Sequence, residues 1–368
     1  YIDVFVIGEG EVTINKFLDI YLENKNLDNF LDMDGIYIPK FNNNAKIALI
    51  DDMKNAYHIT QPIITKTDKE DYKTVFSDSI MLNVSRGCTR GCRFCMSSYL
   101  YRPLRETTIK ELVNIALKTR ENTNLNKITL IGAAVGDYYD LEGLTKALES
   151  EGFQIATPSL RIDSLSRETL ETLKKSGLKS ITIAPESIST LRERINKSIS
   201  DEKIFSVIKN AVDLDFNIKL YFLIGIPYES KEDIEELANY IEKIANMHKN
   251  RNYIKFSINP VIPKPQTPLQ WEVYNFKEIK SKTRYLKKKL RKYNVKFESP
   301  KKGLIQYILS CGNREVGAVI EKSLTEEVTL KEWQSYLPNY NINDELPWSK
   351  IDIGIKSNFL KTENRRLK

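Results

Sequence analysis

From residue 81 onward, short apolar runs alternate with longer segments whose apolar residues recur every three or four positions. The short runs are rich in β-branched and aromatic residues, which predicts buried strands. They cover residues 81–84, 127–132, 153–160, 179–185, 218–227 and 254–263. The longer segments have the spacing of amphipathic helices, and they cover residues 108–120, 141–150, 166–176, 201–214 and 231–247.

Helix-capping residues support the predicted helices. Thr108 stands three residues before Glu111, which is the spacing of a capping box, and Ser166 and Ser230 precede two further helices. Six strands that alternate with helices predict an α/β fold of parallel βα units, closed or partly closed into a barrel. Chemistry in such barrels lies at the carboxyl ends of the strands. The segment directly after residues 81–84 is therefore expected to lie on the functional face.

The first fifty residues have a different pattern. Residues 4–7 predict a buried strand, residues 8–10 a tight glycine turn, and residues 12–21 a helix. Strand, turn and helix form half of an α/β nucleotide-type layer, so we expect the sequence to begin inside a domain. Short strands are expected at 35–40 and 46–51, and residues 52–79 are expected to form a linker.

Composition narrows the class of protein. The 368 residues are 41% hydrophobic, which is enough for a large core and two or three domains. We see no apolar run of membrane-spanning length and no secretory leader, so we expect a cytoplasmic protein with no membrane partner. The net charge of +7 permits an anionic partner without requiring one. Only two histidines occur, His58 and His248, which argues against a histidine-rich zinc site or a Cys/His hydrolase.

Three of the four cysteines lie on one short segment, SRGCTRGCRFC, at residues 85–95. Cys88, Cys92 and Cys95 form the pattern CxxxCxxC. Zinc in a structural site takes four ligands, and the remaining cysteine, Cys311, is far away in the sequence. Three thiolates on one loop instead suit three irons of a [4Fe–4S] cluster, with the fourth iron open to another ligand. A zinc knuckle and three unrelated buried thiols remain the alternatives.

The residues around the cysteines fit this interpretation. Gly87 and Gly91 allow the backbone to curve around a cluster. The segment also carries three arginines, and we expect them to offset the thiolate charge: Arg86, Arg90 and Arg93.

CxxxCxxC after the first strand of a βα barrel, with Phe94 before the last cysteine, resembles the radical SAM enzymes. The resemblance implies that the open iron binds S-adenosylmethionine through its amino and carboxylate groups. Electron transfer to the sulfonium would then produce a 5′-deoxyadenosyl radical, which abstracts hydrogen from a substrate. The cofactor carries this chemistry, and the protein orients and shields it.

Further motifs resemble the radical SAM subgroup that carries an N-terminal cobalamin-binding domain. They are PSLRID at 158–163, TIAPES at 182–187, LRERINK at 191–197, KLYFLIGIP at 219–227 and VIGEGE at 6–11. The resemblance implies the C-terminal part of a Rossmann-like cobalamin domain at 1–51 and a linker at 52–79. A partial (βα)6 TIM-like radical SAM barrel would follow at 80–274, and residues 275–368 would form a small helical extension that caps substrate or cobalamin. Segments 259–271 and 346–360 resemble a less characterised branch of the group.

The same resemblance implies cofactor contacts for individual residues, while catalytic residues stay unassigned. Cys88, Cys92 and Cys95 would bind the cluster. The residues expected to contact S-adenosylmethionine are Phe94 and Tyr99 (or Tyr101) near the adenine, Gly132 and Ala133 at the amino group, Glu186 at the ribose, Ser159 and Arg161 at the end of the third strand, Arg194 (or Arg192) at the carboxylate, and Ile226 against the adenine. Gly8, Glu9 and Gly10 would contact cobalamin.

Several of these features have simpler alternative explanations. Each arginine could form a surface ion pair, and Ile226 could be an ordinary core residue. Residues 277–293 could attract RNA phosphates, but we favour a solvated lysine face over an apolar stripe. For Cys311 we favour a buried structural thiol over one that quenches a radical or faces cobalt. The charged residues 361–368 are expected to fray.

The resemblance favours a cobalamin-dependent radical SAM methyltransferase that methylates an unactivated carbon through a 5′-deoxyadenosyl radical and methylcobalamin. The methyl acceptor could be a macromolecule or a small molecule, and a protein side chain is favoured over nucleic acid. Ferredoxin or flavodoxin would supply electrons. The DxHxxG signature of a cobalt-ligating histidine is absent from the sequence shown, and neither histidine lies in such a context.

Two other functions stay open. The first is a methylthiotransferase, or another radical SAM enzyme, that acts on tRNA or protein. A methylthiotransferase needs three further cysteines before the radical SAM motif, and none precedes Cys88 in the sequence shown. The second and least favoured is a non-catalytic RNA-binding protein with a degenerate barrel.

Overall fold

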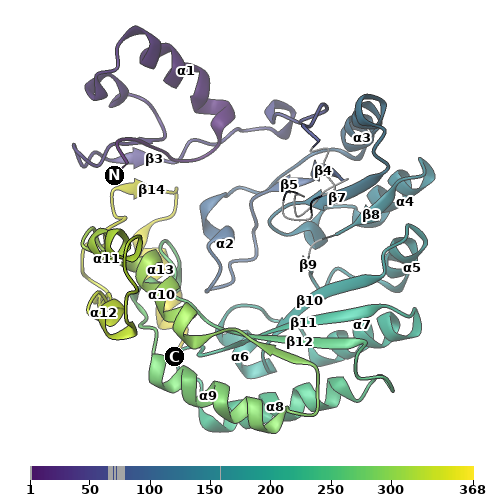
Figure 1. The fold of residues 1–368 in the computed structure, drawn as a ribbon. Coiled ribbons are helices and arrows are strands. Elements are labelled where there is room, and N and C mark those ends of the chain that lie inside the picture. The colour runs from purple at the N-terminus through teal and green to yellow at the C-terminus, as the bar shows by residue number, and fades with distance from the viewer. Residues whose placement is uncertain (1, 65–68, 70–71, 73–78, 158) are drawn as a thin grey trace.

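The structure is a computed structural model that describes residues 2–64, 69, 72, 79–157 and 159–368. Two parallel sheets form its centre (Figure 1). The first sheet has the order β4-β7-β8, with β4 at Ile80–Asn83, β7 at Lys127–Ile131 and β8 at Gln154–Ala156. The second has the order β13-β12-β11-β10-β9, with β9 at Ser159–Leu160, β10 at Ser180–Glu186, β11 at Asn217–Ile224, β12 at Ile254–Pro260 and β13 at Val295–Phe297. The predicted α/β barrel with parallel strands is confirmed.

The predicted strand at 153–160 is wrong in one respect, because it is divided between the two sheets. β8 pairs with β7, whereas β9 pairs with β10. A proline, residue 158, lies in the middle of this run, and a proline has no N–H to donate to a strand ladder. The apolar pattern alone does not register this break.

Helices cover the outer side of the two sheets, as Figure 1 shows for α3, α4, α5, α7 and α8. The five lie at Ile109–Thr123, Leu141–Ser150, Arg167–Lys175, Asp201–Asp213 and Lys231–Ala245, close to the predicted segments. Thr108 and Ser230 form capping boxes, and Ser166 accepts a hydrogen bond from the Thr169 N–H. The core lies between sheets and helices, where Leu220 and Phe222 of β11 and Phe256 of β12 are buried.

The N-terminal segment forms two separate two-stranded pairings. β1 (Phe5–Val6) pairs antiparallel with β2 (Ile36–Tyr37), and β3 (Ala45–Lys46) pairs in parallel with β14 (Ile351–Asp352) near the other end of the chain. The expected burial of residues 4–7 is wrong, because Phe5 and Val6 are 37% and 45% exposed.

The helix of this segment, α1 (Gly10–Glu23), turns most of its apolar stripe outward. Ile14, Leu18 and Tyr21 are exposed. Phe17 packs on Phe30 with ring centroids 4.9 Å apart. The short helices η1 (Leu27–Phe30) and η2 (Met53–Asn55) follow along the chain. The apolar stripe correctly indicated a helix, but not which side of it the protein covers.

The C-terminal extension is helical, as predicted. It contains α9 (Phe276–Lys289), α10 (Pro300–Cys311), α11 (Val316–Ser323), α12 (Leu330–Gln334) and α13 (Ser357–Arg365). In α9, Ile279, Lys282, Thr283 and Leu286 are buried, which confirms the apolar stripe under a lysine-rich face. The predicted fraying of 361–368 is wrong, because Glu363 and Leu367 are buried. None of the helices in the described residues has the length and apolar composition needed to cross a bilayer.

Candidate active site

The cysteine segment leaves the carboxyl end of β4 and forms a loop closed by two short strands. β5 (Ser85–Arg86) pairs antiparallel with β6 (Arg105–Glu106), and the loop between them contains the short helix α2 (Ser97–Leu100). All three cysteines of the loop are free thiols. Cys88 and Cys92 are buried, Cys95 is half-buried, and the Cys95 N–H donates to the Cys92 carbonyl over 3.0 Å. The loop therefore holds three thiols at the carboxyl end of the first barrel strand.

The environment of the thiols fits an iron–sulfur cluster. Burial raises the pKa of Cys92, while the nearby cations Lys197 and Arg161 oppose that rise. A buried thiolate without such cations or a bound metal would be costly. Ser98 Oγ lies 3.9 Å from Cys88 Sγ and donates a hydrogen bond to it. Three thiols on one curved loop would hold three irons of a [4Fe–4S] cluster, so the donor set fits this cofactor.

Two glycines give the loop its curvature. Gly87 has φ +89° and Gly91 has φ +69°, values that residues with a side chain rarely adopt. At Gly87 there is also no room for a side chain, because a Cβ atom would lie 2.2 Å from the Tyr101 carbonyl oxygen. The predicted role of both glycines in curving the backbone is confirmed.

The three arginines of the loop each bind a carboxylate from another part of the chain. Arg86 binds Glu11 at 2.6 Å, Arg90 binds Asp137 at 2.7 Å, and Arg93 binds Glu363 at 3.0 Å. Their expected part in offsetting thiolate charge stays a prediction, although the pKa of Arg90 is raised by its hydrogen bond to Asp137 and, among the lesser causes, by the charge of Cys88. The arginines anchor the loop to α1, to η4 (Val135–Asp137) and to α13.

At the end of β10, Glu186 and Lys197 form a buried ion pair. The Lys197 ammonium donates to Glu186 Oε1 over 2.6 Å, and both side chains are 9% exposed. Glu186 also has φ +68°, an uncommon conformation for a residue with a side chain, and such strain concentrates at functional sites. The sequence analysis did not predict a role for Lys197, although this residue ends the LRERINK motif. It assigned a ligand role only to the arginines of that motif.

The other predicted residues on this face differ in their surroundings. Arg161 binds Asp163 at 3.0 Å and approaches Asp137 at 3.5 Å. Ser159 and Ala133 are exposed, and a Cβ atom on Gly132 would lie 2.8 Å from Ser85 Oγ. The structure thus places residues from the ends of β7, β9 and β10 near one face, and their contacts with S-adenosylmethionine stay predictions.

The two arginines considered for the S-adenosylmethionine carboxylate differ sharply. Arg192, in α6 (Ser189–Arg194), is fully buried and bonded to Asp201 and to the carbonyl of Ser187, which leaves it no free donor face. Arg194 is half-buried and donates to the Tyr228 carbonyl over 2.9 Å. Of the two, only Arg194 retains exposed surface from which to meet a ligand.

The aromatic candidates belong to the cysteine loop, whereas the apolar candidate Ile226 follows β11. Phe94 is half-buried against the core. Tyr99 is fully buried beneath the loop, where its hydroxyl donates to the Gly91 carbonyl over 3.0 Å, whereas Tyr101 is 38% exposed. Ile226 is buried after Gly225, which has φ +78°.

Comparison with known proteins identifies the family. Residues 82–241 match the family model of the radical SAM superfamily. Over 334 residues the chain is 34% identical to the uncharacterized protein MJ0966 of Methanocaldococcus jannaschii. The matched region covers 88% of this chain and 69% of that protein. The chain belongs to the radical SAM superfamily.

Two more distant relatives of this radical SAM protein are named as methyltransferases. The uncharacterized methyltransferase PH0819 of Pyrococcus horikoshii is 24% identical over 74% of this chain and 58% of its own length. The cytidylyl-2-hydroxyethylphosphonate methyltransferase of Streptomyces wedmorensis is 28% identical over 46% of this chain and 34% of its own length. The chain therefore spans between a third and about two thirds of the curated relatives compared here.

Solved structures agree on the fold of this radical SAM protein. The methyltransferase TsrM of Kitasatospora setae, with tryptophan substrate and a SAM analog bound, has a TM-score of 0.53 at 10% identity, over 74% of this chain and 54% of its own. The cobalamin-dependent S-adenosylmethionine radical enzyme OxsB, with aqua-cobalamin and S-adenosylmethionine bound, has a TM-score of 0.50 at 13% identity. The match covers 99% of this chain and 62% of OxsB.

In this radical SAM protein the GEGE motif joins the N-terminal segment to the cysteine loop. Glu9 is buried, and its Oε2 accepts from the Ile50 N–H at 2.7 Å and from Arg105 at 2.8 Å. Arg86 approaches the other oxygen of Glu9 at 3.4 Å. Gly8 has φ +120° and lies against the backbone of Ala48, so close that a Cβ atom would overlap it, while Gly10 begins α1. The contact of Gly8, Glu9 and Gly10 with cobalamin stays a prediction.

Two other features lie outside this site. Cys311 is fully buried, donates to the Pro263 carbonyl, and has its pKa raised to about 12 by burial, which supports a structural thiol.

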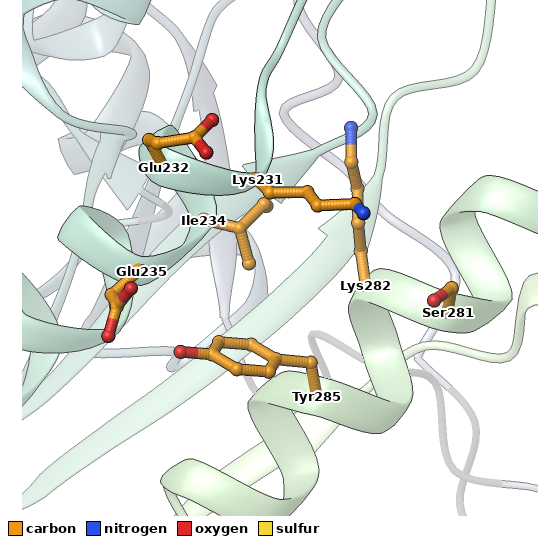
Figure 2. Close-up of a pocket in the computed structure, with 7 residues that line it drawn as sticks. All are labelled: Lys231, Glu232, Ile234, Glu235, Ser281, Lys282 and Tyr285. Atoms are coloured by element: carbon orange, nitrogen blue, oxygen red, sulfur yellow. The ribbon is translucent and has the colours of Figure 1, made fainter.

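A groove between α8 and α9 is lined by Lys231, Glu235 and Tyr285 among others (Figure 2). The groove lies in the outer helical layer, because α8 and α9 cover the outside of the sheet. It is therefore separate from the cysteine loop that follows β4.

Replacing Gly87 with alanine is expected to destabilise the protein more than the same change at Gly152. Both glycines have positive φ, which costs an alanine about 1–2 kcal/mol, but a Cβ atom on Gly152 meets nothing within 4 Å. The collision at Gly87 should add roughly 1–3 kcal/mol, measured by urea unfolding. Equal losses for the two variants would contradict the crowded loop described here.

The ion pair between Glu11 and Arg86 should make the free energy of unfolding depend on pH in the acidic range. The hydrogen bond from Arg86 is the main cause that lowers the pKa of Glu11 from 4.5 to about 2. A carboxyl with a lowered folded pKa stabilises above its unfolded pKa, and loses that contribution as pH falls through the folded value. The stability difference between wild type and Glu11→Gln should therefore shrink from pH 4.5 towards pH 2 in urea titrations. Glu23→Gln, an exposed change on the same helix, is the control, and a pH-independent difference at Glu11 would contradict this prediction.

Proposed function

We propose that this protein is a cytoplasmic, cobalamin-dependent radical SAM methyltransferase that transfers a methyl group to an unactivated carbon atom. When bound, the cluster and S-adenosylmethionine would supply the radical that activates the carbon, and cobalamin would supply the methyl group. The observation that carries the radical part is the loop with Cys88, Cys92 and Cys95 at the carboxyl end of the first barrel strand. Family membership and the fold shared with TsrM and OxsB support it.

The cobalamin part of the proposal is supported by the joint between Glu9, Arg105 and Arg86. This joint holds the N-terminal segment directly against the strands that bracket the cysteine loop. A methyl donor held by the N-terminal region would thus lie beside the place where the radical forms. In this proposal the buried ion pairs help to hold the N-terminal segment at one position, so that a methyl group supplied there would be oriented towards the activated carbon of the substrate.

The residues of the chain have distinct roles in this proposal. The three cysteines hold three irons as thiolates, and burial of the loop limits access of water to the cluster. Glu186, held by Lys197, would accept hydrogen bonds from the ribose hydroxyls, and Arg194 would meet the carboxylate of S-adenosylmethionine. Backbone carbonyls at Gly132 and Ala133 would receive the amino group.

For the methyl acceptor we propose a protein side chain, with ferredoxin or flavodoxin as the electron donor. The TsrM structure was solved with a tryptophan substrate, so a small-molecule acceptor is the alternative to test alongside it. Assays with S-adenosylmethionine carrying a labelled methyl group, in extracts fractionated by size, separate the two acceptors.

The cofactor content of the complete protein tests the proposal. After anaerobic purification with hydroxocobalamin, we expect about four irons and about one cobalt per chain, measured by metal analysis and absorbance. Cys92→Ala should lose most of the iron and retain the cobalt. Four irons without cobalt would contradict the methyltransferase, and about eight irons without cobalt would indicate a methylthiotransferase with a second cluster.

The proposed role of Glu186 predicts weaker binding of S-adenosylmethionine in Glu186→Gln. Hydrogen bonds to a charged group contribute about 1.5–3 kcal/mol, so affinity should fall by roughly ten- to hundredfold in calorimetric titrations of the cluster-loaded protein. The matched control is Glu142→Gln, because Glu142 forms a Glu–Lys pair with Lys146 on the exposed surface of α4. Unchanged affinity in a Glu186 variant with normal iron content would exclude this role.

A further inference from the structure

The C-terminal helix contacts the cysteine loop through one buried ion pair. Arg93 lies between Cys92 and Cys95, and its Nε and Nη2 atoms both lie 3.0 Å from Glu363 Oε2 in α13. The two side chains are only 8% and 6% exposed. A charge in such a position is stabilised mainly by its partner, because water cannot solvate it.

Arg93 also bonds to the segment that carries the proposed S-adenosylmethionine residues. Its backbone N–H donates to the Ile195 carbonyl over 2.9 Å. Its Nη1 atom donates to the Arg194 carbonyl at 2.7 Å and to the Glu193 carbonyl at 3.2 Å. One guanidinium therefore joins three parts of the structure: the cysteine loop, the end of α6 and α13.

Contacts other than Glu363 hold α13 in place. Leu360 and Leu367 are buried. The Asn364 side chain donates to the Pro268 carbonyl, in η5 (Pro268–Trp271), and to Glu272, both over 2.8 Å. A change of Glu363 to its neutral amide should therefore leave the helix docked, so that its effects report on Arg93 and the loop.

We propose that Glu363 is a positioning residue for the cluster, acting through Arg93. The carboxylate fixes the guanidinium of Arg93, a residue that lies between two of the three cysteines in the sequence, and it balances the positive charge of that guanidinium. This inference rests on the cluster of the proposed function. It gives the C-terminal extension a direct part in the radical chemistry that is separate from capping a substrate.

The charges predict shifts of opposite sign in the reduction potential of the cluster. Reduction adds an electron, so a nearby uncompensated positive charge raises the potential and a negative charge lowers it. Glu363→Gln leaves Arg93 uncompensated and should raise the potential. Arg93→Gln removes a buried positive charge and leaves Glu363 paired with the exposed Arg366, so it should lower the potential. A residue that only supported the loop sterically would shift both variants in the same direction.

The experiment compares the complete reconstituted protein with Glu363→Gln, Arg93→Gln, the double variant and Arg366→Gln. Arg366 is the matched control, because it pairs with the outer oxygen of Glu363 and is 63% exposed. Redox titration followed by electron paramagnetic resonance gives the potential, and iron release to a chelator gives the retention of the cluster. Thermal unfolding of the cluster-free proteins measures the fold separately.

We expect opposite shifts in potential and several-fold faster iron release in the two single variants. The double variant should return towards wild-type potential, and Arg366→Gln should match wild type. Shifts of the same sign, or potentials unchanged in proteins that hold the cluster, would overturn the role of Glu363 alone. Wild-type protein without iron would instead overturn the proposed function, and this inference with it.

Discussion

The cysteine loop keeps its shape because arginines on it bind carboxylates from distant parts of the chain. Glu11 lies in the N-terminal segment, Asp137 follows the second barrel strand, and Glu363 lies in the last helix. Hydrogen bonds within the loop, such as that from the Tyr99 hydroxyl to the Gly91 carbonyl, shape it locally, and the ion pairs fix it to the rest of the protein. The anchoring carboxylates thereby also position the N-terminal segment, the barrel and the C-terminal extension relative to one another.

The barrel could be predicted from sequence because its signals are local. Apolar runs such as 218–227 and capping residues such as Thr108 report on structure within a few residues of themselves. The cysteine loop was predictable for the same reason, because ligand spacing and glycines lie within eleven residues. The break between β8 and β9 was missed because the apolar run was interpreted as one strand although it contains a proline, which has no N–H to donate.

The partners of the loop could not be predicted, because nothing local distinguishes an arginine that balances thiolates from one that binds a carboxylate 270 residues away. The same limit explains Glu363, which lies in a charged segment that resembles a frayed end. Its burial depends on the apolar residues Leu360 and Leu367 one turn to either side, which face the body of the protein. The pairing of Lys197 with Glu186 is equally invisible in the sequence, because it depends on how the end of β10 and the segment after α6 come together in the fold.

The pairing of β3 with β14 has a consequence for biosynthesis. Ala45 and Lys46 leave the ribosome long before Ile351 and Asp352, the residues to which they pair. The N-terminal segment and the cysteine loop must therefore wait, with edges and buried charges unpaired, until the last segment of the barrel enzyme has emerged. The anchor that α13 gives to the cysteine loop therefore forms only after the barrel strands have been synthesised.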